Sequence, residues 1–398
     1  MTILNVNDNY LDNSEKSLRK RGLYDFPIVD ADCHYMYTPM GELAQFLEEP
    51  YKSMLIHSTT RGYMNMLPRD IGDRTAVGRL KSQGLYVDQT AAVGNAQGNL
   101  PKAVSPLLKS LQQLGIDYGV VFPTDLLTLG LHPMSELEVA IAKGYAHWMT
   151  EKILPYHDAL KTMLYLPLSN PEACIEIVKE FGHKKGVVGF LITSTRYQPV
   201  HHNSYMPLYK LIEESGKPLA FHTVSYWMER PFQQFNRFLS AHALGFPLYN
   251  MIQLTNIIVN GLPERFPDLK WVFIEAGIAW IPFIMHRLDS EYMYRTSEAP
   301  LLRKKPSEYM KHFYFTSQPF EHFESMDLLS NIFDSFDAEN QLLYASDYPH
   351  PDFDTPKVIY DLPFLNEKAK RKILGENALK LFGIENPKLW ARDGQQFV

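Results

Sequence analysis

The sequence has few of the features that mark several large classes of protein. Only two of its 398 residues are cysteines, Cys33 and Cys174, and they lie far apart in the chain. Two distant cysteines exclude a disulfide framework and a zinc site built on thiolates, so we expect both thiols to be reduced. Any metal ion would have to be held by histidine and carboxylate side chains.

Long apolar runs and blocks of basic residues are also missing. Residues 1–22 lack the apolar core of a signal peptide, and no apolar run is long enough to span a bilayer. Lysine and arginine number 39 against 45 acidic residues, which gives a net charge of −6. This balance does not suit a protein that grips phosphate backbones. We therefore expect a cytoplasmic protein with neither nucleic acid nor membrane as a partner.

Short apolar runs are abundant in this chain, which is 45% hydrophobic. Nearly continuous apolar runs are typical of strands that are buried on both faces of a parallel sheet. Helical spacing of apolar residues occurs between them, as in 171–182 and 204–218. A regular alternation of strands and helices over this length predicts an α/β fold of the (β/α)8, or TIM, barrel type. The candidate strands are residues 26–32, 118–123, 161–168, 187–193, 218–223, 271–277, 312–317 and 341–347.

Two segments exceed the minimal barrel. Residues 1–25 form a polar N-terminal extension, and the barrel takes up 26–398. A long insertion after the first strand, 50–116, is polar and rich in Gly, Asn and Gln, which suits either a lid or a surface decoration. A helical insertion after the fifth strand, 224–262, looks like two helices that either wall a pocket or bury against another subunit. We therefore expect a homo-oligomer, with a dimer as the first choice.

The first predicted strand ends in two aspartates and a histidine. Active sites of such barrels lie at the carboxyl ends of the strands. Strand alternation places Asp30, Asp32 and His34 on one inward face, with Asp32 and His34 nearest the rim. The spacing of Asp32 and His34 allows both to reach one ion. In the alternative interpretation, Asp32 simply caps a loop.

The fifth and eighth strands end in further candidate ligands. His222 closes the fifth strand and Asp347 the eighth, although a buried core histidine and an ordinary turn would explain each of them separately. Their convergence with Asp32 and His34 at one pole favours a mixed oxygen and nitrogen site for one divalent ion. Zinc is our first choice, with manganese or iron as alternatives. Asp347 is then placed to act as a general base.

Four motifs, "VDADCH", "FHTV", "FIEAGIAWIPFIMHRLD" and "ASDYPHPD", carry a family resemblance. Together they resemble the amidohydrolase-related branch of the amidohydrolase superfamily, which contains aminocarboxymuconate-semialdehyde decarboxylase and the nonoxidative aromatic-acid decarboxylases. The similarity runs from about residue 26 to the end of the chain. It implies a mononuclear-metal barrel whose ligand positions are occupied by Asp32, His34, His222 and Asp347.

One position departs from the family's pattern. Decarboxylases of this branch place a histidine at the end of the sixth strand, where this chain has Glu275. An acid beside a metal-bound water suits hydrolysis, whereas a structural carboxylate is the alternative. The sequence therefore favours a metal-dependent hydrolase acting on a small, carboxylate-bearing or aromatic substrate, with Asp347, Glu275 and His222 as catalytic residues. A carboxy-lyase is the second hypothesis, and a non-catalytic barrel is the third.

Candidate substrate-binding residues lie in predicted loops and insertions. Arg61 and Arg196 are each able to clamp a substrate carboxylate, although most loop arginines are merely solvated. Three aromatic side chains are candidates for the pocket wall, with core packing as the alternative. They are Tyr226, Trp227 and Trp280. His350 follows Asp347 by three residues and is predicted to orient it.

Overall fold

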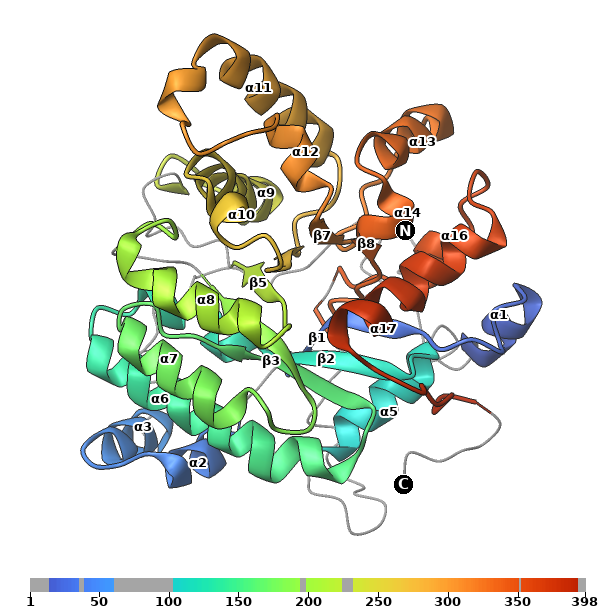
Figure 1. Cartoon of the computed structure of the whole chain (residues 1–398). Helices are drawn as coiled ribbons and strands as arrows, with labels where there is room; N and C mark the ends of the chain where they lie inside the picture. Colours follow the sequence, from blue (N-terminus) through green and yellow to red (C-terminus); the bar gives the residue numbers. More distant parts are fainter. Residues whose placement is uncertain are drawn as a thin grey trace.

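Eight parallel strands form the centre of the molecule (Figure 1). The computed structural model describes residues 14–35, 39–60, 103–193, 198–223, 232–350 and 352–392. Strands that follow one another in sequence are neighbours in the sheet, from β1 to β8. They are β1 Val29–Tyr35, β2 Tyr118–Pro123, β3 Leu160–Tyr165, β4 Val187–Ile192, β5 Leu219–His222, β6 Trp271–Ile274, β7 Phe313–Thr316 and β8 Leu342–Leu343.

The last strand meets the first and nearly closes the sheet into a barrel. The amide of Ala31 donates to the carbonyl of Tyr344 at 2.9 Å, and the amide of Asp347 donates to the carbonyl of Asp32 at 2.8 Å. A parallel bridge also joins Cys33 to Tyr348. The predicted (β/α)8 barrel is therefore confirmed, and each predicted strand overlaps an observed one.

Helices follow the strands and cover the outside of the barrel (Figure 1). Helix α7 shows how the sequence specifies them, because Asn170 accepts a hydrogen bond from the amide of Ala173 and Pro171 occupies the first turn. Its buried face then packs on the strands. The helices between strands are α5 Ser105–Leu114, α6 Ser135–Trp148, α7 Pro171–Phe181, α8 Met206–Glu214, α9 Phe238–Val259, α10 Leu262–Arg265, α11 Trp280–Tyr294, α12 Pro306–Met310, α13 Met326–Ser335 and α14 Ala338–Gln341.

The helices at the two ends of the chain also pack on the barrel. Leu18 of α1, within the predicted polar extension, is buried. Phe382 of α17 belongs to the apolar cluster that fills the barrel interior. None of the described helices is both long and apolar enough to cross a bilayer. These terminal elements are α1 Ser14–Lys20, α15 Lys357–Tyr360, α16 Glu367–Arg371 and α17 Asn377–Phe382.

The predicted insertion 50–116 lies only partly within the described residues. After β1 the chain forms α2 (Met40–Leu43) and α3 (Tyr51–Thr60), and residues 61–102 lie outside the described residues. Helix α5 belongs to the barrel itself and not to an insertion, because it buries one apolar face beside the strands.

The described part of 224–262 contains one helix of 22 residues, α9, where the sequence suggested two. Large apolar side chains are exposed on α9 and on α11, such as Leu239, Phe283 and Tyr294. The homo-oligomer that we expected from this region stays a prediction.

Candidate metal centre

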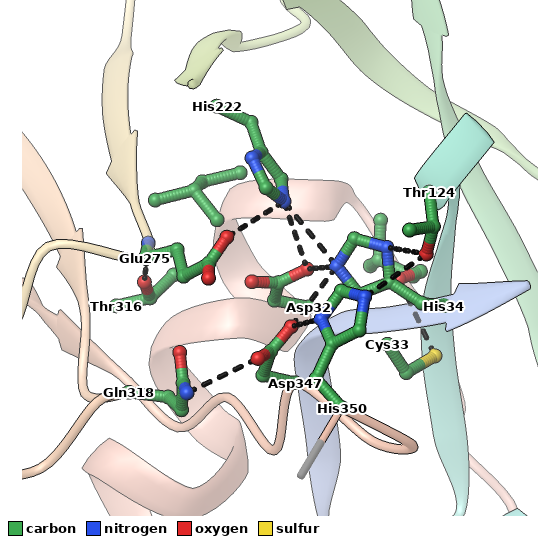
Figure 2. Close-up of polar contacts among 12 residues, drawn as sticks. Asp32, Cys33, His34, Thr124, His222, Glu275, Thr316, Gln318, Asp347 and His350 are labelled. Carbon is green, nitrogen blue, oxygen red and sulfur yellow. Dashed lines mark hydrogen bonds and ion pairs between the residues drawn. The ribbon is translucent and has the colours of Figure 1, made fainter. Parts of the chain in front are cut away.

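Side chains from β1 and β5 meet at the carboxyl end of the barrel (Figure 2). The Nε2 atom of His34 lies 3.0 Å from Oδ1 of Asp32 and 3.3 Å from Nε2 of His222. Phe122 of β2 is in ring contact with both imidazoles. The three side chains are completely or almost completely buried. The strand ends predicted from the sequence therefore do converge.

A fourth donor comes from Glu275, directly after β6. Its Oε2 atom lies 3.5 Å from Nε2 of His222. Asp32, His34, His222 and Glu275 each offer a ligand atom within 4.8 Å of the others. We call these four side chains the donor group. Asp347 belongs to a second, overlapping group with His34 and His350, and its Oδ1 atom lies 3.1 Å from Nε2 of His34.

Both rim carboxylates have an unusual backbone conformation. Glu275 has a φ of 54° and Asp347 a φ of 58°, which lie in the left-handed region. Residues other than glycine are held there only when the surroundings require it, at a cost of about 1–3 kcal/mol each. The amide of Glu275 donates to the hydroxyl of Thr316 at 3.0 Å, which fixes the turn. The chain thus bends sharply at both strand ends and turns a carboxylate toward the donor group.

Asp30 does not join this group, contrary to the alternation predicted for the first strand. The register of β1 against β2 shifts between Asp30 and Cys33. Val29 and Ala31 therefore face the barrel interior, whereas Cys33 belongs to the outer core. Such an irregularity re-aims the side chains that follow it. It gives Asp32 and His34 the inward positions.

The oxygen and nitrogen atoms of the donor group are arranged in a way that suits a bound cation. Apart from the imidazoles of the group itself, no described residue donates a hydrogen bond to either carboxylate oxygen of Asp32 or to Oε2 of Glu275, although all three atoms are buried. Buried polar atoms nearly always have a partner, so each such case requires an explanation. Two imidazole Nε2 atoms also face each other in the same place. Oxygen and imidazole nitrogen atoms are ligands of zinc, manganese and iron, so the residues fit a divalent metal ion.

The electrostatics of the group favour positive charge at this point. Burial opposes a charge on His34, but the carboxylates of Asp32 and Asp347 raise its pKa to about 10. Burial likewise opposes the charge on Asp32, yet His222 and His34 hold its pKa below the ordinary value. Glu275 differs, because burial and the nearby charges of Asp347 and Asp32 raise its pKa well above the usual range.

Asp347 is held in place by two side chains. His350 Nδ1 lies 2.6 Å from its Oδ1 atom, and the amide of Gln318 donates to Oδ2 at 3.1 Å. Burial opposes the charge on Asp347, but His350 and His34 lower its pKa. The structure therefore places His350 against Asp347, at the position where the sequence predicted an orienting residue.

Of the five predicted substrate-binding residues, one lies within the described part of the chain. Arg61, Arg196, Tyr226 and Trp227 lie outside the described residues. Trp280 is buried at the start of α11, where its ring contacts Phe273 and Phe315 and its indole donates to a backbone carbonyl. These partners belong to the core between strands and helices. Trp280 thus takes the core-packing alternative, because its ring turns toward the outside of the barrel.

Thr124 and Gln318 are site residues that the sequence analysis missed. Thr124 follows β2 directly, and its hydroxyl lies between His34 and His350. Gln318 follows β7 by two residues and contacts Asp347. The rule that polar residues at strand ends form the site would have found both, had it been applied to the second and seventh strands.

The sequence also matches a known family over most of its length. A profile of the amidohydrolase family matches residues 29–384. The chain belongs to this family. Within it, the chain is 22% identical over 224 residues to the 2-amino-3-carboxymuconate-6-semialdehyde decarboxylase of Dictyostelium discoideum. That alignment covers 55% of this chain and only 60% of the relative.

A second relative and a protein of similar fold are also decarboxylases. The chain is 23% identical over 252 residues to the gamma-resorcylate decarboxylase of a Polaromonas species, which covers 60% of this chain and 74% of the relative. The fold is similar to that of a 5-carboxyvanillate decarboxylase from Novosphingobium aromaticivorans, crystallised with manganese and a nitrobenzoic acid. The TM-score is 0.65 at 16% identity, over 92% of this chain and 97% of that structure.

Proposed function

We propose that this amidohydrolase family member is a metal-dependent nonoxidative decarboxylase that acts on an aromatic or dienoic acid. The observation that carries the proposal is the convergence of Asp32, His34 and His222 in a chain whose relatives from Dictyostelium and Polaromonas are decarboxylases. The relatives favour this activity over the hydrolysis that Glu275 suggested in the sequence.

The metal ligands in this proposal are Asp32, His34 and His222, with Asp347 as the fourth. When bound, a divalent ion supplies the positive charge that attracts a substrate carboxylate and stabilises the negative charge that develops during the reaction. Zinc, manganese and iron all suit this donor set, and manganese occupies the Novosphingobium structure. His350 and Gln318 keep Asp347 oriented toward His34.

Glu275 has the role of proton donor. In the reaction the bond between the substrate carbon and its carboxylate breaks, CO2 leaves, and the electron pair stays on the carbon, which then takes up one proton. Glu275 is suited to supply that proton because its carboxyl group is buried, and burial favours the neutral form. Solvent then returns a proton to Glu275, so that one proton is consumed for each CO2 released.

This role also accounts for the departure from the family's pattern. A protonated carboxyl group donates a proton as an imidazolium does, provided that its surroundings keep it neutral. Glu275 meets this condition, because its side chain is almost completely buried and burial raises its pKa. Glutamate at this position is therefore compatible with decarboxylation.

The proposal is tested with purified protein loaded with Mn²⁺ or Zn²⁺. The substrates are γ-resorcylate, 5-carboxyvanillate and 2-amino-3-carboxymuconate-6-semialdehyde, and the methyl esters of the first two serve as probes of hydrolysis. We expect CO2 release from at least one acid and, in D2O, deuterium on the carbon that lost the carboxylate. Asp32→Asn is the inactive control. Ester cleavage without any CO2 release would instead establish a hydrolase.

A further inference from the structure

The hydroxyl group of Thr124 lies between His34 and His350 (Figure 2). Thr124 begins the short helical turn after β2. Its Oγ1 atom lies 3.2 Å from Nδ1 of His34 and 3.1 Å from Nε2 of His350. The centroids of the two rings are 4.4 Å apart. Within the described part of the chain, the hydroxyl has no other side-chain partner.

The number of protons on these groups limits how they bond. A threonine hydroxyl carries one hydrogen, so it donates one hydrogen bond and accepts two. Each neutral imidazole carries its proton on one nitrogen and accepts on the other. Thr124 therefore cannot donate to both rings, and at least one of the facing nitrogens must carry a proton.

The position of His34 determines which nitrogen that is. Its Nε2 atom is the one that faces Asp32 and His222, so metal binding uses Nε2. A ligand must offer a lone pair, which leaves the proton of His34 on Nδ1. Nδ1 then donates to Thr124, and the hydroxyl proton of Thr124 is free to donate to His350.

The remaining contacts complete a chain with one direction. His350 accepts from Thr124 at Nε2, so its own proton is on Nδ1, which lies 2.6 Å from Oδ1 of Asp347. His34, Thr124 and His350 thus each donate one hydrogen bond to the next residue, and Asp347 accepts the last one. A single hydroxyl thus connects the orientation of a donor imidazole with that of the rim carboxylate.

The other histidine of the donor group is held differently. His222 directs Nε2 at the same point, and its Nδ1 atom lies 2.9 Å from the backbone carbonyl of Thr223. That carbonyl can only accept, so it fixes the same tautomer without the help of a side chain. His34 relies on a side-chain hydroxyl in the corresponding place, which makes its tautomer sensitive to substitution.

We propose that Thr124 is a positioning residue that fixes the tautomer and ring orientation of His34 and, through His350, the orientation of Asp347. This inference rests on the metal role proposed for His34. Loss of such a partner of a metal-binding histidine typically lowers metal affinity by about 10–100-fold. A serine at this position keeps the hydroxyl and should keep the affinity.

The test compares Thr124→Val and Thr124→Ser with the wild-type protein. Zn²⁺ affinity is measured by competition with a chromophoric chelator, and the visible spectrum of the Co²⁺-loaded protein reports the ligand environment. Thr162→Val is the matched control, because it removes a buried strand hydroxyl that donates to the carbonyl of Val121, away from the donor group. Circular dichroism melts of the metal-free proteins show whether each variant is folded.

We expect Thr124→Val to bind Zn²⁺ about 10–100-fold more weakly and to change the Co²⁺ spectrum, whereas Thr124→Ser and Thr162→Val resemble the wild type. Wild-type affinity in Thr124→Val would overturn the inference and leave the metal site intact. An equal loss in Thr124→Ser would also overturn it, because the hydroxyl would then not be responsible. Failure of the wild-type protein to bind Zn²⁺ or Co²⁺ would remove the metal role of His34 and this inference with it.

Discussion

The barrel buries charged side chains at both ends, and the two groups differ in how fully their hydrogen bonds are satisfied. At the amino end, Asp117 precedes β2 and pairs with Arg392 at 3.0 Å. Its carboxylate also accepts hydrogen bonds from the amides of Ile28 and Ala391. Arg392 in turn donates to the backbone carbonyls of Tyr24, Phe26 and Gly115.

The group at the carboxyl end lacks this saturation. Apart from the imidazoles of the same group, no described residue donates a hydrogen bond to the carboxylate oxygens of Asp32 or to Oε2 of Glu275. Buried charged groups whose hydrogen bonds are all satisfied hold chain segments together. The Asp117–Arg392 pair joins the two ends of the described chain to the amino end of the barrel. Buried oxygens of this kind, gathered around two imidazole nitrogens that face each other, indicate a bound metal ion or substrate instead. The following substitutions test this distinction, from the largest expected effect to the smallest.

The largest effect is expected from Asp32→Asn. Replacing one carboxylate oxygen by an NH2 group puts a donor where a metal requires a lone pair. Bound metal should therefore fall to background, a greater loss than the ~10–100-fold that follows from removal of an outer partner. Elemental analysis after loading and desalting measures this. Asp158→Asn, which removes a carboxylate that pairs with Lys161, is the control and should retain the metal. Full metal content in Asp32→Asn would contradict the site.

Glu275→Gln should separate chemistry from metal binding. Loss of a general acid typically costs about 10²–10⁴-fold in rate. We expect a decrease of this size in CO2 release while the bound metal stays at the wild-type level. Asp347→Asn should instead lose metal, because Asp347 is the proposed fourth ligand. The opposite pattern, with metal lost in Glu275→Gln and kept in Asp347→Asn, would exchange the two roles.

Substitutions in the Asp117–Arg392 pair should lower the stability of the fold and leave the metal content unchanged. Arg392→Met leaves Asp117 buried without a counter-charge, and breaking such a pair costs about 3–5 kcal/mol of folding free energy. Urea denaturation followed by circular dichroism measures the loss. Glu176→Gln breaks the exposed pair with Lys143 and is the control, with an expected cost of about 0.2–1 kcal/mol. Loss of metal in a folded Arg392→Met protein would contradict the distinction between the two ends.

The same variant should have a characteristic pH dependence. Burial raises the pKa of Asp117 to about 6, although Arg392 opposes the rise. A folded pKa above the unfolded value of about 3.9 means that stability is greatest at low pH and is lost as the carboxyl ionises. Without Arg392 this pKa should rise further. The stability difference between wild type and Arg392→Met should therefore shrink as the pH falls from about 7 to about 4, and a constant difference would contradict this account.

The sequence predicted the barrel well because its strands are marked by local composition. Runs such as 118–123 and 187–193 are apolar on both faces, and they match β2 and β4 within one residue. The shift within β1 was not predictable in this way. "VDADCHY" shows no regular alternation of apolar and polar residues from which a bulge could be recognised. The direction of the Asp30 side chain depends on pairing with β2 and with the segment after β8.

The site was predicted only where the side chain itself indicates chemistry. Asp32, His34 and His222 are ligand types at strand ends, and the structure brings them together. Thr124 also follows a strand, but a threonine there is common, and its importance comes from His350, 226 residues away. The Asp117–Arg392 pair spans 275 residues and likewise has no local signal.

Ser346→Ala should have the smallest of these effects. It tests the distinction between structural and ligand-binding carboxylates at Asp30, which lies close to the donor group. Asp30 accepts hydrogen bonds from the hydroxyl and the amide of Ser346 and from the amide of Asp32, so it ties the ends of β1 and β8 together. Asp30 is thus saturated although it lies two residues from Asp32. Removing the hydroxyl bond to this carboxylate should cost about 1.5–3 kcal/mol of stability in urea denaturation.

Metal content in Ser346→Ala should remain at the wild-type level, because two backbone amides still hold Asp30 in place. Ser290→Ala is the control for loss of a serine hydroxyl, since Ser290 is exposed and donates only within its own helix. If a carboxylate with all its hydrogen bonds satisfied has a structural role, then Asp30 has that role although it lies close to the donor group. A Ser346→Ala protein that keeps its stability but loses its metal would show that proximity is what matters, and Asp30 would then belong to the metal centre.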